Sequence, residues 1–134
     1  MDGSWAIRNT DSDAKACAAG VSPAGSSWGG EQDAVRHCVW LCLMSEKVGY
    51  NSAMAVAGIH EKHHPPPTVP KPPTGYSTVE DWSKADTEMD NSNNNVGAQL
   101  GRACGHKNCC NECKSALKQG LLKVNSPGGY KFGP

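Results

Sequence analysis

Three separate groups of polar residues in this sequence carry the side chains that acid/base catalysis uses. The candidate residues are Arg36 and His37, His60 and Glu61, and Asp90 with Asn93 and Asn94. A histidine beside carboxylate and amide groups can transfer protons, and an arginine can hold an anion or a developing negative charge. If helices bring the three groups to one end of a core, the sequence predicts one catalytic site.

The first group lies in a stretch, residues 33–44, that is apolar on nearly every face. Helical spacing places Asp33, Arg36 and His37 near one another on one side, with Trp40 a turn further along. A helix of this composition is expected in the middle of a small domain, so these polar groups would be drawn into the interior. Because unpaired burial would be costly, the sequence predicts polar partners from elsewhere in the chain.

A metal site is a second interpretation of the same residues. Zinc accepts imidazole and carboxylate ligands, and the predicted ligand set is His60, Glu61 and Asp90, with His37 as a further candidate. Residues 60–64 also match the H-E-x-x-H pattern of zinc peptidases. Pro65 disfavours helical geometry at His64, however, so a metallopeptidase is the less favoured form of this prediction.

The third interpretation involves no chemistry. Arg36, Asp90 and the asparagines would instead form a satisfied buried network that fixes the register of the helices. The protein would then be a non-catalytic extracellular structural or matrix protein. The residues alone leave this alternative open beside a secreted, hydrolase-like or toxin-like domain.

The composition narrows the class of protein. A chain of 134 residues predicts a single domain, 1–134, with a modest core. The formal net charge is zero, with 13 basic and 13 acidic residues, so nucleic acid is not an expected partner. The sequence contains no apolar run long enough for a membrane span, so none is expected.

Seven cysteines predict disulfide bonds and therefore secretion. A zinc site fits less well, because Cys38 and Cys42 on the buried stretch make a poor second pair for Cys110 and Cys113. We expect Cys17 and the cluster at 104–113 to tie the ends of the chain onto Cys38 and Cys42. The odd count leaves one cysteine free, or available for self-assembly.

The pattern along the chain predicts an all-α, disulfide-linked bundle of three to four main helices with long loops. Residues 1–30 are expected to be loop-rich, with a short helix at about 11–19. A helical hairpin should follow at 31–63, with helices at about 31–48 and 53–61. Residues 77–124 should hold a long helix, the cysteine cluster and a last amphipathic helix that includes Leu121 and Val124. Residues 125–134 should form a tail.

Two local features complete the sequence prediction. The four asparagines within 90–95 are poor helix formers, so they mark either a functional position within the long helix or a polar loop that splits it into two shorter helices. Its start is expected at the capping box formed by Ser77 and Glu80. Residues 64–76 form a proline-rich loop, a stiff linker that could also serve self-assembly.

The spacing of the three polar groups resembles that of a small uncharacterised domain family. The matching pattern is Asp33-Ala-x-Arg36-His37-x-x-Trp40, then His60-Glu61, then Met89-Asp90-x-x-Asn93-Asn94-x-x-Gly97. Such domains are associated with secreted bacterial proteins, including toxin-like ones, and with some extracellular invertebrate proteins. The resemblance spans about residues 33–101 and implies that the seven candidates form one constellation. It implies no particular reaction, and the proline stretch and cysteine cluster depart from the bacterial pattern.

Overall fold

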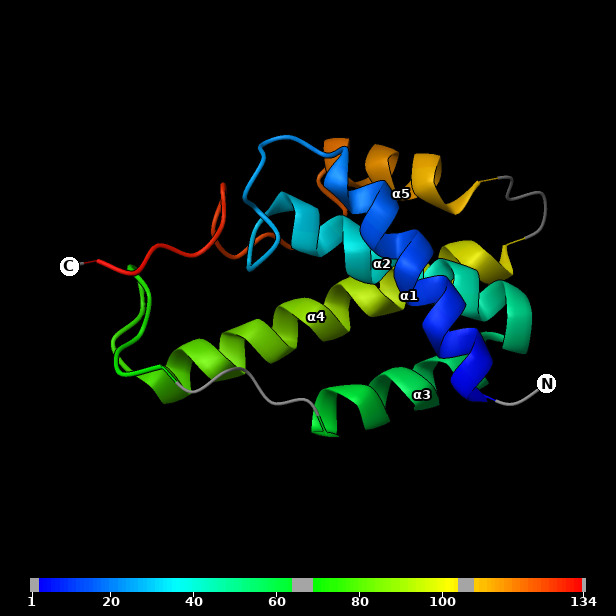
Figure 1. Ribbon diagram of the computed structural model, residues 1–134, viewed down its shortest axis with the longest axis horizontal. Helices are drawn as coiled ribbons and strands as arrows, with labels where there is room; N and C mark the ends of the chain where they lie inside the picture. The colour runs from blue at the N-terminus through cyan, green and yellow to red at the C-terminus, as the bar shows by residue number, and fades with distance from the viewer. Residues whose placement is uncertain (1–2, 64–68, 104–107, 134) are drawn as a thin grey trace.

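The computed structural model of the chain is built from five helices (Figure 1). It describes residues 3–63, 69–103 and 108–133, and side chains from residue 9 onward except those of residues 62 and 63. The helices are α1 (Gly3–Ala19), α2 (Glu31–Val48), α3 (Tyr50–His63), α4 (Val79–Arg102) and α5 (Cys109–Lys118). These described residues contain no strand, which confirms the all-α prediction.

Helix α2 is the centre of the fold and contacts each of the other four helices. Glu31 and Asp33 lie in its first turn, where negative charge complements the helix dipole. It ends at Gly49, whose φ of 90° favours glycine. The predicted helix at 31–48 is therefore confirmed, and α3 runs back below it in Figure 1.

The closest packing in the core is between α2 and α4. A Cβ atom on Gly97 would collide with the carbonyl oxygen of Cys38, and one on Gly101 would collide with that of Cys42. Both glycines lie on the α4 face that meets α2, so the absence of side chains allows the two backbones to approach closely. This contact fixes how α4 is rotated relative to α2, and hence which α4 side chains meet His37.

Helix α4 is continuous through its asparagine run, so the alternative of a splitting loop is wrong. Asn93 and Asn94 are almost fully buried, and tertiary contacts outweigh their poor helix propensity. The predicted cap at Ser77 is also wrong by one residue. Thr78 is the N-cap, and its side chain accepts a hydrogen bond from the backbone N–H of Asp81.

Three disulfides hold α1 and α5 to the rest of the molecule. They join Cys17 to Cys110, Cys38 to Cys113, and Cys42 to Cys109. The expectation that the C-terminal cysteines bind the central helix is confirmed for two of these bonds. Cys17, near the end of α1, instead pairs with Cys110 on α5. The seventh cysteine, Cys104, lies outside the described residues.

Several predicted boundaries need correction. Most of the segment 1–30 is helix α1, not loop. Helix α3 begins at Tyr50, three residues before the predicted start. Helix α5 begins earlier than expected and ends at Lys118, because Gly120 adopts a φ of 76° and turns the chain away. Leu121 and Val124 therefore lie beyond the helix.

Two remaining predictions concern the loop and the membrane. Residues 64–68 of the proline-rich loop lie outside the described part, and residues 69–76 are not helical. Among the described helices, none is long and apolar enough to cross a membrane. The predicted absence of a membrane span agrees with this finding.

Candidate functional site

His37 lies at the centre of a buried polar cluster between α2, α3 and α4. Its side chain is only 4% exposed. Its Nε2 atom lies 3.3 Å from Asp33 Oδ1 and 3.2 Å from Asp90 Oδ1. Its Nδ1 atom lies 3.0 Å from Asn94 Oδ1 and 3.9 Å from Glu61 Oε1. The imidazole is therefore surrounded by oxygen atoms on both nitrogen sides.

Asn94 fixes which nitrogen of His37 carries the proton in the neutral ring. The amide oxygen of Asn94 can only accept, so the contact at 3.0 Å requires a proton on Nδ1. The unprotonated nitrogen of a neutral His37 is then Nε2, and its lone pair faces Asp33 and Asp90. A second residue thus holds the ring in a defined tautomer and orientation.

Arg36 supplies positive charge on the same side of the ring. Its Nη2 atom lies 2.9 Å from Asp33 Oδ1 and 3.1 Å from His37 Nε2. Asp33 also accepts a hydrogen bond of 2.7 Å from the backbone N–H of Gly29. Burial alone would raise the pKa of Asp33, but the hydrogen bond to His37 and the charges of His37 and Arg36 lower it. Asp33 is therefore ionised at neutral pH.

Asp90 is poorly matched to its surroundings. Among the described residues its Oδ1 atom has no hydrogen-bond partner, although it is buried and within ion-pair distance of His37 Nε2. Burial raises the pKa of Asp90 to about 8, against the opposing charge of His37. Burial likewise raises the pKa of Glu61, and the charge of His37 opposes that rise. Burial therefore disfavours the ionised form of both Asp90 and Glu61.

Asp86 adds a fourth carboxyl group to the electrostatic environment. Burial raises its pKa, and the hydroxyl of Tyr130 donates a hydrogen bond of 2.8 Å to its Oδ1 atom. The cluster therefore combines four acidic side chains with one guanidinium and one imidazole.

The pKa of His37 is raised above its ordinary value. Burial lowers this pKa, but the hydrogen bond to Asp33 and the charge of Asp90 outweigh the effect of burial.

Five of the seven predicted site residues come together in this cluster. They are Arg36, His37, Glu61, Asp90 and Asn94.

The remaining two predicted residues have other contacts. Asn93 directs both ends of its amide to the backbone of Lys123, at 2.9 and 2.7 Å. The ring of His60 lies 5.0 Å from that of Trp40, centroid to centroid, in an edge-on arrangement. The hydrogen bonds of Asn93 are of the kind expected under the alternative of a satisfied buried network, and His60 packs against Trp40.

Two carboxylates of the cluster were absent from the predicted site. Asp33 precedes His37 by four residues on α2, and Asp86 precedes Asp90 by four residues on α4. Each therefore lies on the same face of its helix as a predicted site residue. This spacing was the available signal.

The described residues contain two groups that could hold a metal ion. In the first, ligand atoms of Asp33, His37 and Asp90 lie within 4.8 Å of one another. The predicted ligand set His60, Glu61 and Asp90 is not among these groups, because His60 packs on Trp40. Asp90 belongs to both sets, and so does His37, which the sequence offered as a further candidate.

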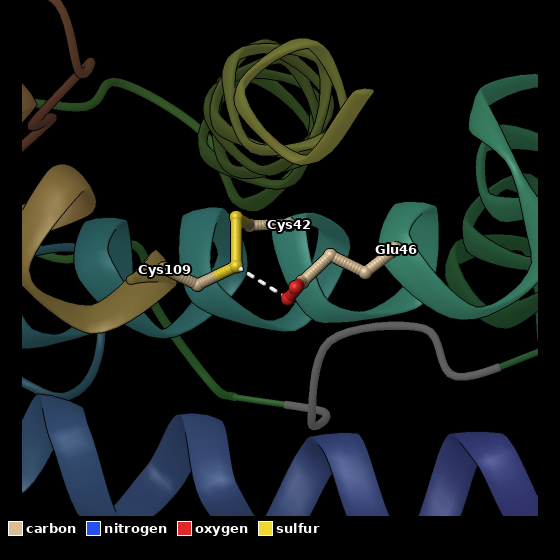
Figure 2. A group of neighbouring side chains, drawn as sticks. All are labelled: Cys42, Glu46 and Cys109. Carbon is tan, nitrogen blue, oxygen red and sulfur yellow. Dashed lines mark hydrogen bonds between the residues drawn. A yellow bond between two sulfur atoms is a disulfide. The ribbon is translucent and has the colours of Figure 1, made fainter. Parts of the chain in front are cut away.

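The second group consists of Cys42, Cys109 and Glu46 (Figure 2). Glu46 Oε1 lies 3.1 Å from the Sγ atom of Cys109. Both sulfur atoms belong to one disulfide, so neither is a thiolate that could bind zinc, and neither carries a hydrogen to donate. This group does not fit a metal in the oxidised protein.

Comparison with known proteins gives a family but no activity. No curated protein matches the chain. No solved structure matches it either. A family model described as "Domain of unknown function (DUF6973)" matches residues 4–123, which include all five helices except the first residue of α1. The chain therefore belongs to the DUF6973 family of domains of unknown function.

Proposed function

We propose that this chain is a secreted, hydrolase-like or toxin-like domain whose reactive centre is the cluster around His37. The observation that carries this proposal is the excess of acidic over basic side chains in the cluster. Three acidic side chains, Asp33, Glu61 and Asp90, lie within 3.9 Å of His37, and Asp86 interacts with the cluster through its charge, whereas the basic side chains are two, Arg36 and His37. A buried network that serves only stability is expected to match its charges, because unmatched burial is destabilising.

The side chains at the solvent side of the cluster suit distinct catalytic roles. Glu61 is 14% exposed and comes from α3, so it can exchange protons with a bound substrate or water. Arg36 is 30% exposed and can hold an anionic group or a developing negative charge. His37 and Asp90 are the buried members of the cluster, and Asn94 positions His37.

The disulfides support the proposed location outside the cell. Three of them bind α1 and α5 to the core, and such bonds persist in oxidising compartments. A secreted hydrolase of this size benefits from the cross-links, because a small core alone gives a modest stability.

A structural role is the second candidate, and one observation favours it. His37 is almost completely closed off from solvent, as in a core network of an extracellular structural or matrix protein. Under this alternative the cluster fixes helix register and carries out no reaction. The two candidates differ in what happens when one carboxylate is neutralised.

Neutralising Asp90 with Asp90→Asn, and Glu61 with Glu61→Gln, tests the proposal. Both variants should lose at least ~100-fold of the hydrolysis rate on a panel of ester, phosphodiester and peptide substrates. Both should melt at the same temperature as the unchanged protein or higher, since each removes a poorly matched charge. Glu46→Gln, which neutralises an exposed carboxylate outside the cluster, is the matched control. No hydrolysis of any substrate, together with lower melting temperatures in both variants, would identify a structural network.

A further inference from the structure

We propose that Asp33, His37 and Asp90 hold one divalent transition-metal ion, of which zinc is the representative. The ion would be the cofactor of the proposed reactive centre, so this inference rests on the proposed function. Metal binding can nevertheless be measured independently of any activity. The first basis is the spatial grouping. The three residues come from α2 and α4, and their ligand atoms lie within 4.8 Å of one another.

The second basis is an unsatisfied buried oxygen. Asp90 is 8% exposed, and its Oδ1 atom, which lies 3.2 Å from His37 Nε2, finds no hydrogen-bond partner among the described residues. A buried carboxylate oxygen without a partner is costly, and natural proteins rarely retain one without a use. An added cation between this oxygen and the imidazole would satisfy it.

Three groups compete for the Nε2 atom of His37. The Nε2 lone pair of a neutral ring accepts a hydrogen bond from Arg36 Nη2 at 3.1 Å, which leaves an ionised Asp90 with an unpaired Oδ1 atom at 3.2 Å. A protonated ring instead places an N–H group 3.1 Å from Arg36 Nη2, which is also a donor. A metal ion accepts electron pairs from one nitrogen and two oxygens at once, so it resolves both conflicts.

The distances suit a first coordination shell. Ligand atoms bound to one tetrahedral zinc at roughly 2.1 Å lie about 3.4 Å from each other. The two distances from His37 Nε2 to the carboxylate oxygens, 3.3 and 3.2 Å, are close to this spacing. Three protein ligands also leave one position open, as catalytic zinc requires.

Asn94 prepares His37 to be a ligand. By accepting the Nδ1 proton at 3.0 Å, it leaves Nε2 as the atom that can donate a lone pair to the ion. The mixed nitrogen and oxygen donors favour zinc or a similar transition metal over magnesium or calcium, which prefer oxygen ligands alone.

Arg36 is the competing cation in this arrangement. Its Nη2 atom lies beside both Asp33 and His37, so its guanidinium must withdraw when the ion binds. Space for this movement exists next to it, in a recess of about 370 Å³ lined also by Lys15 and Gln32. Replacing the guanidinium by an uncharged chain should therefore strengthen metal binding.

Calorimetric titration of the oxidised, chelator-treated protein with zinc, without substrate, tests the proposal. We expect the protein to bind one ion per chain. The affinity should fall by roughly 100-fold or more in Asp33→Asn and in Asp90→Asn. It should rise by about 10-fold in Arg36→Met, which removes the competing cation. Asn94→Leu should weaken binding by roughly 10-fold, whereas Asn94→Asp, which can still accept the Nδ1 proton, should retain it. The ¹⁵N resonance of His37 Nε2 should shift on zinc addition, which a purely structural ring would not show.

Two controls separate this site from other zinc-binding groups. Glu46→Gln and the double variant His63→Ser/His64→Ser should bind zinc as the unchanged protein does. Absence of binding, binding unaffected by Asp33→Asn and Asp90→Asn, or binding lost in either control would overturn the proposal. Zinc binding without hydrolysis would overturn only the proposed function, and hydrolysis without zinc binding would overturn only this inference.

Discussion

Two buried polar regions lie next to each other on α4, and they differ in how well their partners match. In the first region, Asn93 exchanges two hydrogen bonds with the backbone of Lys123. Asn125 donates to the carbonyl of Ala85 at 2.9 Å and to the hydroxyl of Tyr130 at 3.1 Å. All of these groups are neutral, and each donor meets an acceptor.

The second region, around His37, contains the adjacent residue Asn94 and has a different character. Its carboxyl groups outnumber its basic groups, and the buried Oδ1 of Asp90 and Nδ2 of Asn94 lack hydrogen-bond partners among the described residues. The comparison separates two uses of buried polarity. Matched neutral groups attach the segment after α5 to α4, whereas the unmatched charges indicate a site that is completed by something it binds.

The largest effect is expected from breaking the matched region with Asn93→Leu. The substitution keeps the branched shape of the side chain but removes the partners of the N–H and carbonyl of Lys123, so it should cost about 3 kcal/mol of unfolding free energy. Thermal melting should fall by roughly 10 °C. The control is Asn91→Leu, an exposed position on the same helix, which should change stability by less than about 0.5 kcal/mol. Equal effects in the two variants would contradict a structural role for Asn93.

A smaller loss of stability is expected from the unmatched region as pH rises. The pKa of Asp90 is raised from 3.8 to about 8, so the folded state holds its proton more tightly than the unfolded chain does. The stability from this group is complete below pH 4 and is lost as pH rises through about 8. The raised pKa values of His37, Glu61 and Asp86 act in the same direction, while the lowered pKa of Asp33 acts against them at acidic pH.

Urea unfolding of the chelator-treated protein between pH 5 and pH 9 measures this dependence. We expect the unfolding free energy to fall by about 2 kcal/mol over that range. This is less than the free energy equivalent to the whole pKa shift of Asp90, since each pKa unit corresponds to about 1.4 kcal/mol. Asp90→Asn should be more stable at pH 8 and should flatten the curve. A curve of the same slope in both proteins would show that Asp90 is not the unmatched group.

Much of the fold could be predicted, because its main signals are local. The apolar stretch at 33–44 and the turn at Gly49 define α2 without reference to the rest of the chain. Helix α1 lacked such signals, since Gly, Ser, Asp and Thr in its sequence are weak helix formers. It is held by packing on α2 and by the Cys17–Cys110 bond, which are tertiary effects.

The site was only partly predictable, for a geometric reason. Adjacent residues on a helix point about 100° apart, so only one of Asn93 and Asn94, and one of His60 and Glu61, can face His37. The choice depends on how α4 and α3 are rotated against α2. For α4 that rotation follows from the contacts of Gly97 and Gly101 with the backbone of α2, which spacing in the sequence does not reveal.

The smallest effect concerns Tyr130, whose hydroxyl belongs to both regions. It accepts a hydrogen bond from Asn125 in the matched region and donates one to Asp86 in the unmatched region. Tyr130→Phe should cost about 1 kcal/mol of unfolding free energy. Because this hydrogen bond lowers the pKa of Asp86, it favours the ionised carboxylate, so its loss should cost more at pH 8 than at pH 5.

Tyr50→Phe is the matched control for this last prediction. The hydroxyl of Tyr50 donates a hydrogen bond of 2.7 Å to the neutral amide oxygen of Asn95, so its removal should cost the same at both pH values. Urea unfolding of both variants at pH 5 and pH 8 makes the comparison. A pH-independent loss in Tyr130→Phe would mean that the hydroxyl serves only the matched region. A loss that grows with pH would instead show that Tyr130 stabilises the ionised form of the acidic cluster. The tail segment around Tyr130 would then couple the stability of the matched region to the protonation of the unmatched region, which we propose to be reactive.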